Sequence, residues 1–231
     1  MAKLLTIEHL SVGIASSKGK VQAVRDVSFS LNAGEVLAIV GESGCGKSVL
    51  CKAIMRLLPK SAAIESGRIV ANGTDITNYS EREMQALRGK FFSFVFQDPM
   101  TALNPTIPVG RQIAEAICVH EPKLPKKEVY RRVIELMEVV GIRRPQERYH
   151  LYPHDFSGGM RQRAVMAIAL AADPKVLIAD EPTGNLDPEP SWGIVHLLEE
   201  INNFGTTILV TTHDEKLVNQ LRRRVITLCH G

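Results

Sequence analysis

Short apolar runs along the chain predict strands of two kinds. In residues 23–31, Val27, Phe29 and Leu31 alternate with polar positions, which indicates an antiparallel strand with one buried face. The run at 35–40 is apolar from its second residue onward, as in a parallel strand that is covered on both faces. Further runs lie at 4–10, 91–96, 176–179 and 206–211. The pattern therefore predicts an α/β fold with a parallel sheet and additional antiparallel strands.

Helical patterns separate these runs. A helix is predicted over residues 47–58, because Pro59 cannot continue it. Ser80 and Glu83 are three positions apart, the spacing of a capping box at the start of another helix. A helix near 192–204 separates the last two apolar runs, which is the strand–helix–strand order of a parallel sheet.

Residues 98–163 lack strand patterns and are predicted to be helical. One apolar face of this segment consists of Val129, Val133, Leu136 and Val140. Gly141 follows as a plausible C-cap, since glycine readily adopts the left-handed conformation that ends many helices. We therefore expect an inserted helical subdomain between the strands.

The composition limits the classes of partner. The chain has 231 residues, of which 45% are hydrophobic and 23% charged, as in ordinary globular proteins. Its net charge of +3 is dispersed and only 5% of residues are aromatic, so no nucleic acid partner is expected. No apolar run approaches the length of a membrane-spanning helix, and the N-terminus lacks the apolar stretch of a signal peptide. We expect a cytoplasmic protein.

A glycine-rich string lies directly between a predicted strand and a predicted helix. Its residues are Gly41, Glu42, Ser43, Gly44, Cys45, Gly46, Lys47 and Ser48, with Val49 next in the helix. This spacing fits a loop whose backbone N–H groups surround a triphosphate. Lys47 can neutralise the outer phosphates and Ser48 can bind Mg²⁺. The alternative is a merely flexible glycine turn, but that would not require the strand and helix on either side.

Two carboxylates end the run at 176–179. Asp180 follows a buried strand, where a charge is costly unless it is compensated, and a Mg²⁺ ion would compensate it. Glu181 is then placed to orient or deprotonate a water that attacks the γ-phosphate of ATP. Taken alone, the pair could also be the start of a loop with a helix-capping role.

A second phosphate-binding string precedes Asp180. It reads Phe156-Ser157-Gly158-Gly159-Met160-Arg161-Gln162-Arg163. Ser157 and the two glycines can present a hydroxyl and bare N–H groups at the start of a helix, which is a surface that binds phosphate. The string resembles the signature motif of ABC ATPases, commonly Leu-Ser-Gly-Gly-Gln. The resemblance covers essentially the whole chain.

This resemblance implies a fold. It is the ABC cassette, a P-loop NTPase with a parallel RecA-like core sheet, an antiparallel β subdomain and an inserted helical subdomain. Residues 1–231 would form one such domain. Residues 1–97 and 164–231 would be the nucleotide-binding core with its β subdomain, and residues 98–163 the helical subdomain that carries the signature motif.

The resemblance also implies roles for further residues. In this family two subunits enclose two MgATP molecules, and Ser157, Gly158 and Gly159 of one chain would contact the ATP of the other. Gln97 is similar to the residue that touches the metal or the attacking water, and His213 to the one that contacts the γ-phosphate. Asp187, in Asn185-Leu186-Asp187, is similar to the D-loop residue near the nucleotide. The implied catalytic residues are Glu181, His213 and Gln97, and the implied Mg²⁺ ligands are Ser48, Gln97 and Asp180.

One position departs from the family pattern. ABC ATPases usually stack an aromatic residue on the adenine, and the matching position here is Ile14. An aliphatic contact can hold the base, but the stacking energy, about 1–3 kcal/mol in other nucleotide sites, would be reduced. We expect weaker nucleotide binding with the chemistry retained.

The two parts of the chain resemble different ABC ATPases. The string Phe96-Gln-Asp-Pro-Met-Thr-Ala-Leu-Asn-Pro105 is typical of oligopeptide, dipeptide and nickel importers, and residues 1–183 resemble their ATPases. The strings Gly184-Asn-Leu-Asp-Pro188 and Gly205-Thr-Thr-Ile-Leu209 resemble FtsE-type cell-division and lipoprotein-export ATPases, as do residues 184–231 as a whole. The first part implies peptide or nickel import at the cytoplasmic face of the plasma membrane. Its partners would be membrane-spanning permease subunits, a second ABC ATPase that is identical or paralogous, and indirectly a substrate-binding protein. The alternatives are a division ATPase that regulates cell-wall hydrolysis through a membrane partner, and a soluble DNA-repair or translation ATPase.

Overall fold

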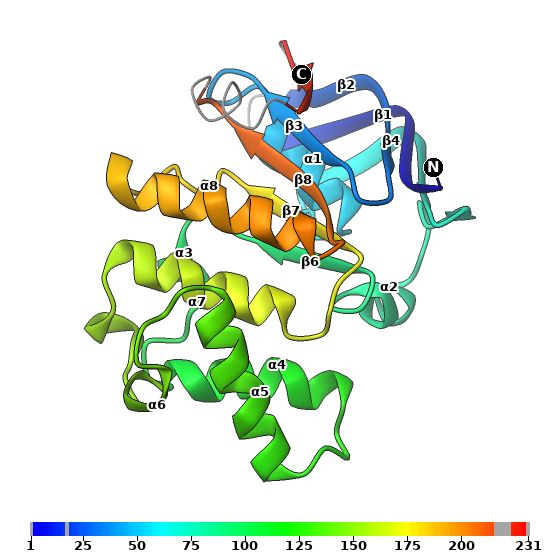
Figure 1. The fold of residues 1–231 in the computed structure, drawn as a ribbon. Helices are drawn as coiled ribbons and strands as arrows, with labels where there is room; N and C mark the ends of the chain where they lie inside the picture. Colours follow the sequence, from blue (N-terminus) through cyan, green and yellow to red (C-terminus); the bar gives the residue numbers. More distant parts are fainter. Residues whose placement is uncertain (1, 17–18, 215–222, 230–231) are drawn as a thin grey trace.

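The computed structural model describes residues 2–16, 19–214 and 223–229. Two sheets lie at one end of the molecule in Figure 1, and a group of helices lies at the other. Across the described ranges, none of the helices combines the length and the hydrophobicity that crossing a bilayer requires.

A five-stranded parallel sheet forms the centre of the structure. Its strand order is β6 (Phe92–Val95), β7 (Val176–Asp180), β8 (Thr207–Thr212), β3 (Val36–Val40) and β9 (Arg224–Thr227). Every residue of β7 and β8 is buried, because neighbouring layers cover both faces of the sheet. The predicted parallel strands are confirmed. The apolar pattern misses β9, a four-residue edge strand whose side chains are mostly exposed.

An antiparallel sheet packs beside the parallel one (Figure 1). Its order is β2 (Gly19–Asn32), β1 (Lys3–Ser16), β4 (Ala62–Ala71) and β5 (Thr74–Asp75). The antiparallel pairing predicted from alternating residues is confirmed, and both long strands extend beyond the predicted runs. The sequence pattern misses β4 and β5, because polar residues and Gly67 interrupt the apolar positions of β4.

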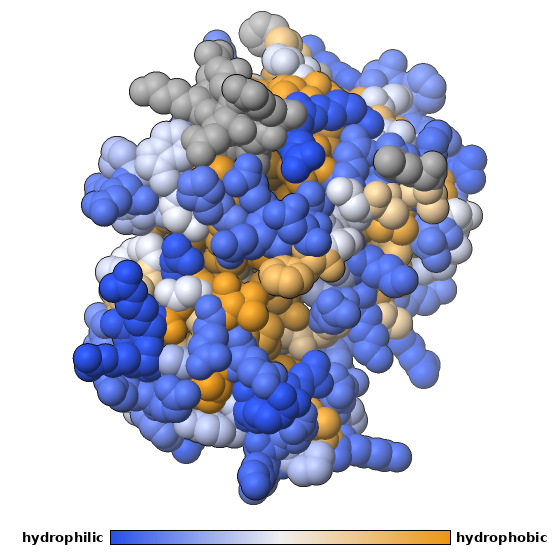
Figure 2. Space-filling model, in the orientation of Figure 1, coloured by the Kyte–Doolittle hydropathy of each residue, from blue (hydrophilic) through white to orange (hydrophobic). Residues whose placement is uncertain are grey.

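Alternate residues of the parallel strands face two separate hydrophobic cores. Val36 and Ala38 of β3 contribute to a core shared with the helices of the inserted segment and with the helix that follows β7. Leu37 and Ile39 contribute to the other core, shared with the antiparallel sheet and the helix that follows β3. Hydrophilic residues cover most of the face shown in Figure 2, and hydrophobic residues are visible in a band across its middle.

The helix α1 (Lys47–Ile54) follows β3 and is shorter than the predicted 47–58. It ends in a Schellman motif, in which Arg56 adopts a left-handed φ of 55°. The N–H of Arg56 donates to Ala53 O, and that of Leu57 donates to Lys52 O. The helix therefore stops before Pro59, at a motif that usually contains glycine and here contains arginine.

The remaining helices largely follow the predictions. The capping box of Ser80 and Glu83 is present at the start of α2 (Glu81–Leu87). The inserted segment contains α3 (Pro99–Ala102), α4 (Val109–His120), α5 (Lys126–Val139), α6 (Pro145–Arg148), the 3₁₀ helix η1 (Pro153–Asp155) and α7 (Gly158–Leu170). On the predicted apolar face of α5, Leu136 is half-buried and the others are buried, and Gly141 has a φ of 75°. The division of the chain at residue 163 stays a prediction, and α7 runs through that position.

The helix α8 (Pro188–Asn203) begins earlier than the predicted 192–204. Pro188 occupies its first turn and Asp187 the N-cap position. Proline is well suited to the first turn, because its fixed φ matches the helix and its missing N–H has no partner there. The start is therefore set by a residue that the apolar pattern cannot report.

Gly67 and Gly73 allow a matched test of the antiparallel sheet. Both have a left-handed φ, but a Cβ at Gly67 would meet the backbone of His9 and lie 2.5 Å from Leu10 Cα, whereas one at Gly73 would meet nothing within 4 Å. We expect Gly73→Ala to cost about 1–2 kcal/mol of unfolding free energy from its φ alone. Gly67→Ala should cost clearly more, as measured by urea unfolding. Equal losses would show that the close approach is unimportant.

Candidate functional site

Several loops meet at the carboxyl-terminal edge of the parallel sheet. Residues 41–46 follow β3, Gln97 follows β6, Asp180 and Glu181 stand at the end of β7, and His213 follows β8. Because the strands are parallel, these ends lie at the same edge, which is where ligands bind in open α/β sheets. Residues far apart in the sequence are therefore neighbours here.

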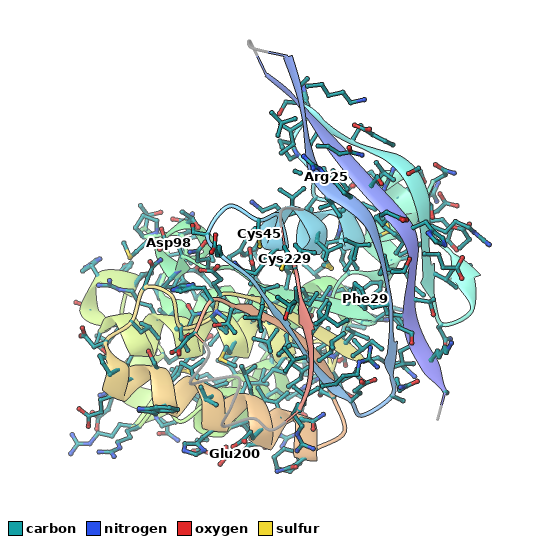
Figure 3. The ribbon with its side chains drawn as sticks, turned by 90° about the horizontal axis from the view of Figure 1, so that it is seen from above. Arg25, Phe29, Cys45, Asp98, Glu200 and Cys229 are labelled. Atoms are coloured by element: carbon teal, nitrogen blue, oxygen red, sulfur yellow. The ribbon has the colours of Figure 1, made fainter. Side chains whose placement is uncertain are left out.

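The glycine-rich loop is tightly packed at its first residue. A Cβ on Gly41 would lie 2.5 Å from Cys45 Sγ and 2.5 Å from the carbonyl oxygen of Leu228. Cys45 and Cys229, which follows Leu228, are labelled close together in Figure 3. A side chain at position 41 would therefore force the loop away from the segment that follows β9.

Lys47 is the cation of the site. Its side chain is 3% exposed, and its Nζ donates to the carbonyl oxygens of Gly41 at 2.7 Å and Glu42 at 2.9 Å. The same ammonium group lies 3.3 Å from Glu181 Oε1. The Lys47 side chain thus lies between its own loop and the carboxylate of Glu181. An anion that enters the loop would therefore meet a positive charge that is already in position.

Asp180 lies at the buried end of β7 and is 3% exposed. Its Oδ1 accepts hydrogen bonds from Ser48 Oγ at 3.0 Å and from Thr211 Oγ1 at 2.7 Å. The neighbouring Cys51 thiol is fully buried in α1, and burial, reinforced by the negative charge of Asp180, raises the pKa of the thiol well above its usual value. Cys51 is therefore a neutral packing residue beneath the site.

The donor set at Asp180 suits Mg²⁺. A carboxylate and the Ser48 hydroxyl adjoin each other, and both are hard oxygen ligands. In the part of the chain that the structure describes, no group of three or more His, Cys, Asp or Glu side chains could hold a metal by itself. Mg²⁺ usually binds through one or two protein oxygens together with water and substrate phosphates, so the two observations agree.

Glu181 connects the predicted catalytic residues. Its Oε2 accepts from Gln97 Nε2 at 3.2 Å and lies 3.1 Å from His213 Nδ1, while Oε1 faces Lys47. The side chain is only 12% exposed. Its backbone has a φ of 44°, a left-handed conformation that is uncommon for a residue with a side chain. The structure thus brings together the three predicted catalytic side chains, and their roles stay a prediction.

The predicted D-loop adjoins Gln97. Asn185 Nδ2 donates to the carbonyl oxygen of Gln97 at 3.4 Å. Asp187 is exposed, stands at the N-cap position of α8 and makes no capping hydrogen bond with its side chain. Its predicted contact with nucleotide stays a prediction.

The predicted signature residues begin α7. Ser157 is the N-cap and accepts from Met160 N at 3.4 Å, and Gly158 and Gly159 form the first turn. Because α7 and α1 belong to cores on opposite faces of the parallel sheet, the sheet separates the two helices within one chain. This arrangement fits a motif that meets the nucleotide of another subunit.

Ile14 lies at the far end of β1. It is half-buried and pairs with Val21 and Ala62 of the neighbouring strands. The structure therefore offers an aliphatic surface at this position, and the predicted contact with adenine and weaker nucleotide binding stay predictions.

The sequence reasoning missed Thr211. This residue is fully buried in β8, and its hydroxyl contacts Asp180. A signal was present, since the apolar run at 208–210 is followed directly by two threonines, just before the predicted site. Recognising its role requires the register of β7 and β8, which places Thr211 directly opposite Asp180.

The comparisons with known proteins agree with this geometry. Residues 24–184 match the family model described as ABC transporter. The chain belongs to the ABC transporter family. It is 46% identical to the oligopeptide transport ATP-binding protein OppD of Bacillus subtilis and 47% identical to the dipeptide transport ATP-binding protein DppD of the same organism. Both matches cover 100% of this chain, which spans 65% and 69% of the two relatives.

Solved structures confirm the ABC cassette fold. The dimeric ATP-binding cassette MJ0796, bound to ADP and Pi, has a TM-score of 0.87 and 25% identity and covers 99% of this chain and 95% of its own. A cassette of the cbiONQ transporter complex from Clostridium perfringens has a TM-score of 0.83 and 32% identity, over 100% of this chain and 86% of its own. The matches to OppD and DppD run past residue 184, and the separate likeness of residues 184–231 to FtsE-type ATPases stays a prediction.

The buried pair of Lys47 and Glu181 yields a stability prediction. Lys47→Met leaves a nearly buried carboxylate without its cation, and we expect a loss of about 3–5 kcal/mol in unfolding free energy. In that background Glu181→Gln should recover much of the loss, because the amide carries no charge. Urea unfolding of the two single variants and the double variant measures this coupling. Strictly additive effects would show that the two side chains do not interact.

Proposed function

We propose that this chain is the ATP-binding and ATP-hydrolysing subunit of an importer, with peptides as the favoured cargo. The observation that carries the proposal is the Glu181 carboxylate, which contacts three side chains suited to a phosphate and its attacking water. They are Lys47, Gln97 and His213. This cluster adjoins the glycine-rich loop and Asp180, so a phosphate-binding loop, a metal-binding pair and a candidate base share one edge of the sheet.

The loop and the start of α1 would hold the nucleotide. N–H groups of this loop would surround a triphosphate, and Lys47 would exchange its loop carbonyls for phosphate oxygens. Ser48 and Asp180 would hold Mg²⁺, which supplies charge neutralisation at the phosphates. Gln97 would complete this group from the β6 side.

Glu181 would act on the water. Its carboxylate has little solvent contact and can orient a water molecule and accept its proton. His213 Nδ1 contacts the Oε2 atom of this carboxylate. Attack of the water oxygen on the γ-phosphorus would form one P–O bond and break the bond from that phosphorus to the oxygen shared with the β-phosphate. Glu181 would take the proton of the water, and ADP would leave with the negative charge on its β-phosphate, close to Lys47. The ion pair thus places the residue proposed to act on the water, Glu181, next to Lys47, which is proposed to bind the phosphates.

Two chains would form the active ATPase dimer. The solved structure of MJ0796 is described as a dimer, and the Ser157 end of α7 would meet the nucleotide of a second chain. The second chain can be identical or a paralogue. ATP would drive closure of the dimer because it would contact the glycine-rich loop of one chain and the Ser157 end of α7 of the other in the closed form. In the open form it would contact the loop alone, and this difference in affinity is what a ligand-driven change needs.

The cargo is proposed from the relatives. Their names describe oligopeptide and dipeptide transport, and the similarity extends over the full chain. We therefore favour peptides, with nickel as the other cargo class of similar importers. The proposed partners are membrane-spanning permeases at the cytoplasmic face and, through them, a substrate-binding protein. The cell-division alternative rests on the likeness of residues 184–231 alone, and no contact among the described residues of that segment favours it.

Glu181→Gln tests the hydrolytic role. The amide cannot accept the proton, so we expect hydrolysis to fall about 100-fold or more. ATP affinity should be retained, because the substitution leaves Lys47 and the loop intact, and the variant should accumulate as a closed dimer. The readouts are phosphate release, nucleotide binding and size in solution. The control is Glu189→Gln, an exposed carboxylate of α8. Near-normal hydrolysis by the Glu181 variant would remove this residue from the role.

Affinity capture from membranes of the source organism tests the transport role. The chain should co-purify with two multi-span permeases and a peptide-binding protein, as identified by mass spectrometry. A nickel-binding protein in its place would change the cargo. Recovery of a single FtsX-like protein would move the chain to cell division, and absence of any membrane partner would contradict a transport role.

A further inference from the structure

Thr211 lies beside Asp180 and Glu181, the two carboxylates of the candidate site. It belongs to β8, is fully buried and lies opposite Asp180 in the parallel register of β7 and β8. A threonine hydroxyl in such a place must find partners within the protein, because an unpaired buried polar group is costly. The partners it finds are both parts of the candidate site.

The first partner is the side chain of Asp180. Thr211 Oγ1 donates to Asp180 Oδ1 at 2.7 Å, and Ser48 Oγ reaches the same oxygen at 3.0 Å. Two hydroxyls, one from the helix α1 and one from the strand β8, donate to the same oxygen and hold the carboxylate. The orientation of Asp180 is therefore set before any cation binds.

The second partner is the backbone of Glu181. A hydroxyl has one hydrogen, which Thr211 gives to Asp180, so its oxygen accepts the hydrogen bond from Glu181 N at 3.1 Å. The same N–H also donates to the Thr211 carbonyl oxygen at 3.0 Å. This shared hydrogen bond holds the residue whose φ is left-handed, at 44°. Conformations of this kind persist where surrounding contacts enforce them.

We propose that Thr211 is a positioning residue of the nucleotide site, whose hydroxyl sets Asp180 for Mg²⁺ and holds the backbone that aims Glu181 at the attacking water. The proposal rests on the ATPase function proposed above. It concerns the hydroxyl alone, since the methyl group of Thr211 packs in the sheet whatever the hydroxyl does. Outer contacts of this type commonly change metal affinity or activity when they are removed.

The chain offers a matched control in the same strand. Thr207 is also fully buried in β8, and its Oγ1 also accepts one backbone N–H, from Gly34 at 2.9 Å. It lies at the opposite end of the strand from the site. Thr207→Val therefore reports what the loss of a buried hydroxyl does to the sheet in general, and Thr211→Val adds whatever is specific to the site.

The experiment compares the full chain with T211V, T211S and T207V. Binding of a non-hydrolysable ATP analogue is measured with Mg²⁺ and with a chelator, and hydrolysis is measured separately for kcat and KM. In T211V, we expect the gain in affinity that Mg²⁺ provides to fall about tenfold and kcat to fall by a similar factor. Binding in chelator should stay as in the parent. T211S restores the hydroxyl and should recover both values, and T207V should match the parent in both.

Three results would overturn the proposal. The first is a T211V protein that keeps the parent's kcat and the parent's gain in analogue affinity from Mg²⁺, in a parent that hydrolyses ATP and shows such a gain. Another is a T211S protein as impaired as T211V, since the hydroxyl would then not be the cause. The third is equal losses in T211V and T207V with and without Mg²⁺, which would indicate general destabilisation. A parent that binds the analogue without any Mg²⁺ dependence and does not hydrolyse ATP would instead overturn the proposed function, and this inference with it.

Discussion

A nearly buried carboxylate at the edge of a parallel sheet needs a positive charge close by, and here the cation is Lys47. The sheet brings Glu181 and Asp180 to an edge with little solvent, where isolated negative charges would be costly. The chain meets this constraint by placing Lys47 at the start of α1, within reach of Glu181 and of its own loop. Asp180 receives two hydroxyl donors in place of a cation. The loop, the helix start and the strand ends therefore depend on one another.

The same arrangement suits the site to binding an anion. Lys47 is held by carbonyl oxygens and one carboxylate, none of which carries the charge of a triphosphate. A polyphosphate would compete for the ammonium group and free Glu181 to face its remaining partners. In the proposed cycle, binding of the polyphosphate and release of Glu181 from Lys47 would be one exchange of ion pairs.

The sequence predicts which residues converge better than it predicts the elements around them. Lys47, Ser48 and the carboxylates after an apolar strand do meet at one edge of the sheet, and their roles toward phosphate and Mg²⁺ stay predictions. The missed elements have local physical reasons. β4 contains polar residues and Gly67, β9 is a short exposed edge strand, and α1 ends at an arginine in a conformation typical of glycine. The role of Thr211 depends on strand register, which a single sequence does not specify.

The strand order of the parallel sheet has a consequence for how the protein is made. β3 is an early strand of the chain, yet its two neighbours in the sheet are β8 and β9, which come far later. During synthesis on the ribosome, β3 therefore emerges with both of its hydrogen-bonding edges unpaired and most of its apolar side chains exposed. Long-range pairings of this kind form slowly, and unpaired apolar strands readily associate with other chains. In a nascent chain of this family member, the glycine-rich loop therefore follows a strand that stays unpaired until β8 and β9 have also been synthesised. A chaperone bound to β3 during that interval would protect its apolar side chains from association with other chains.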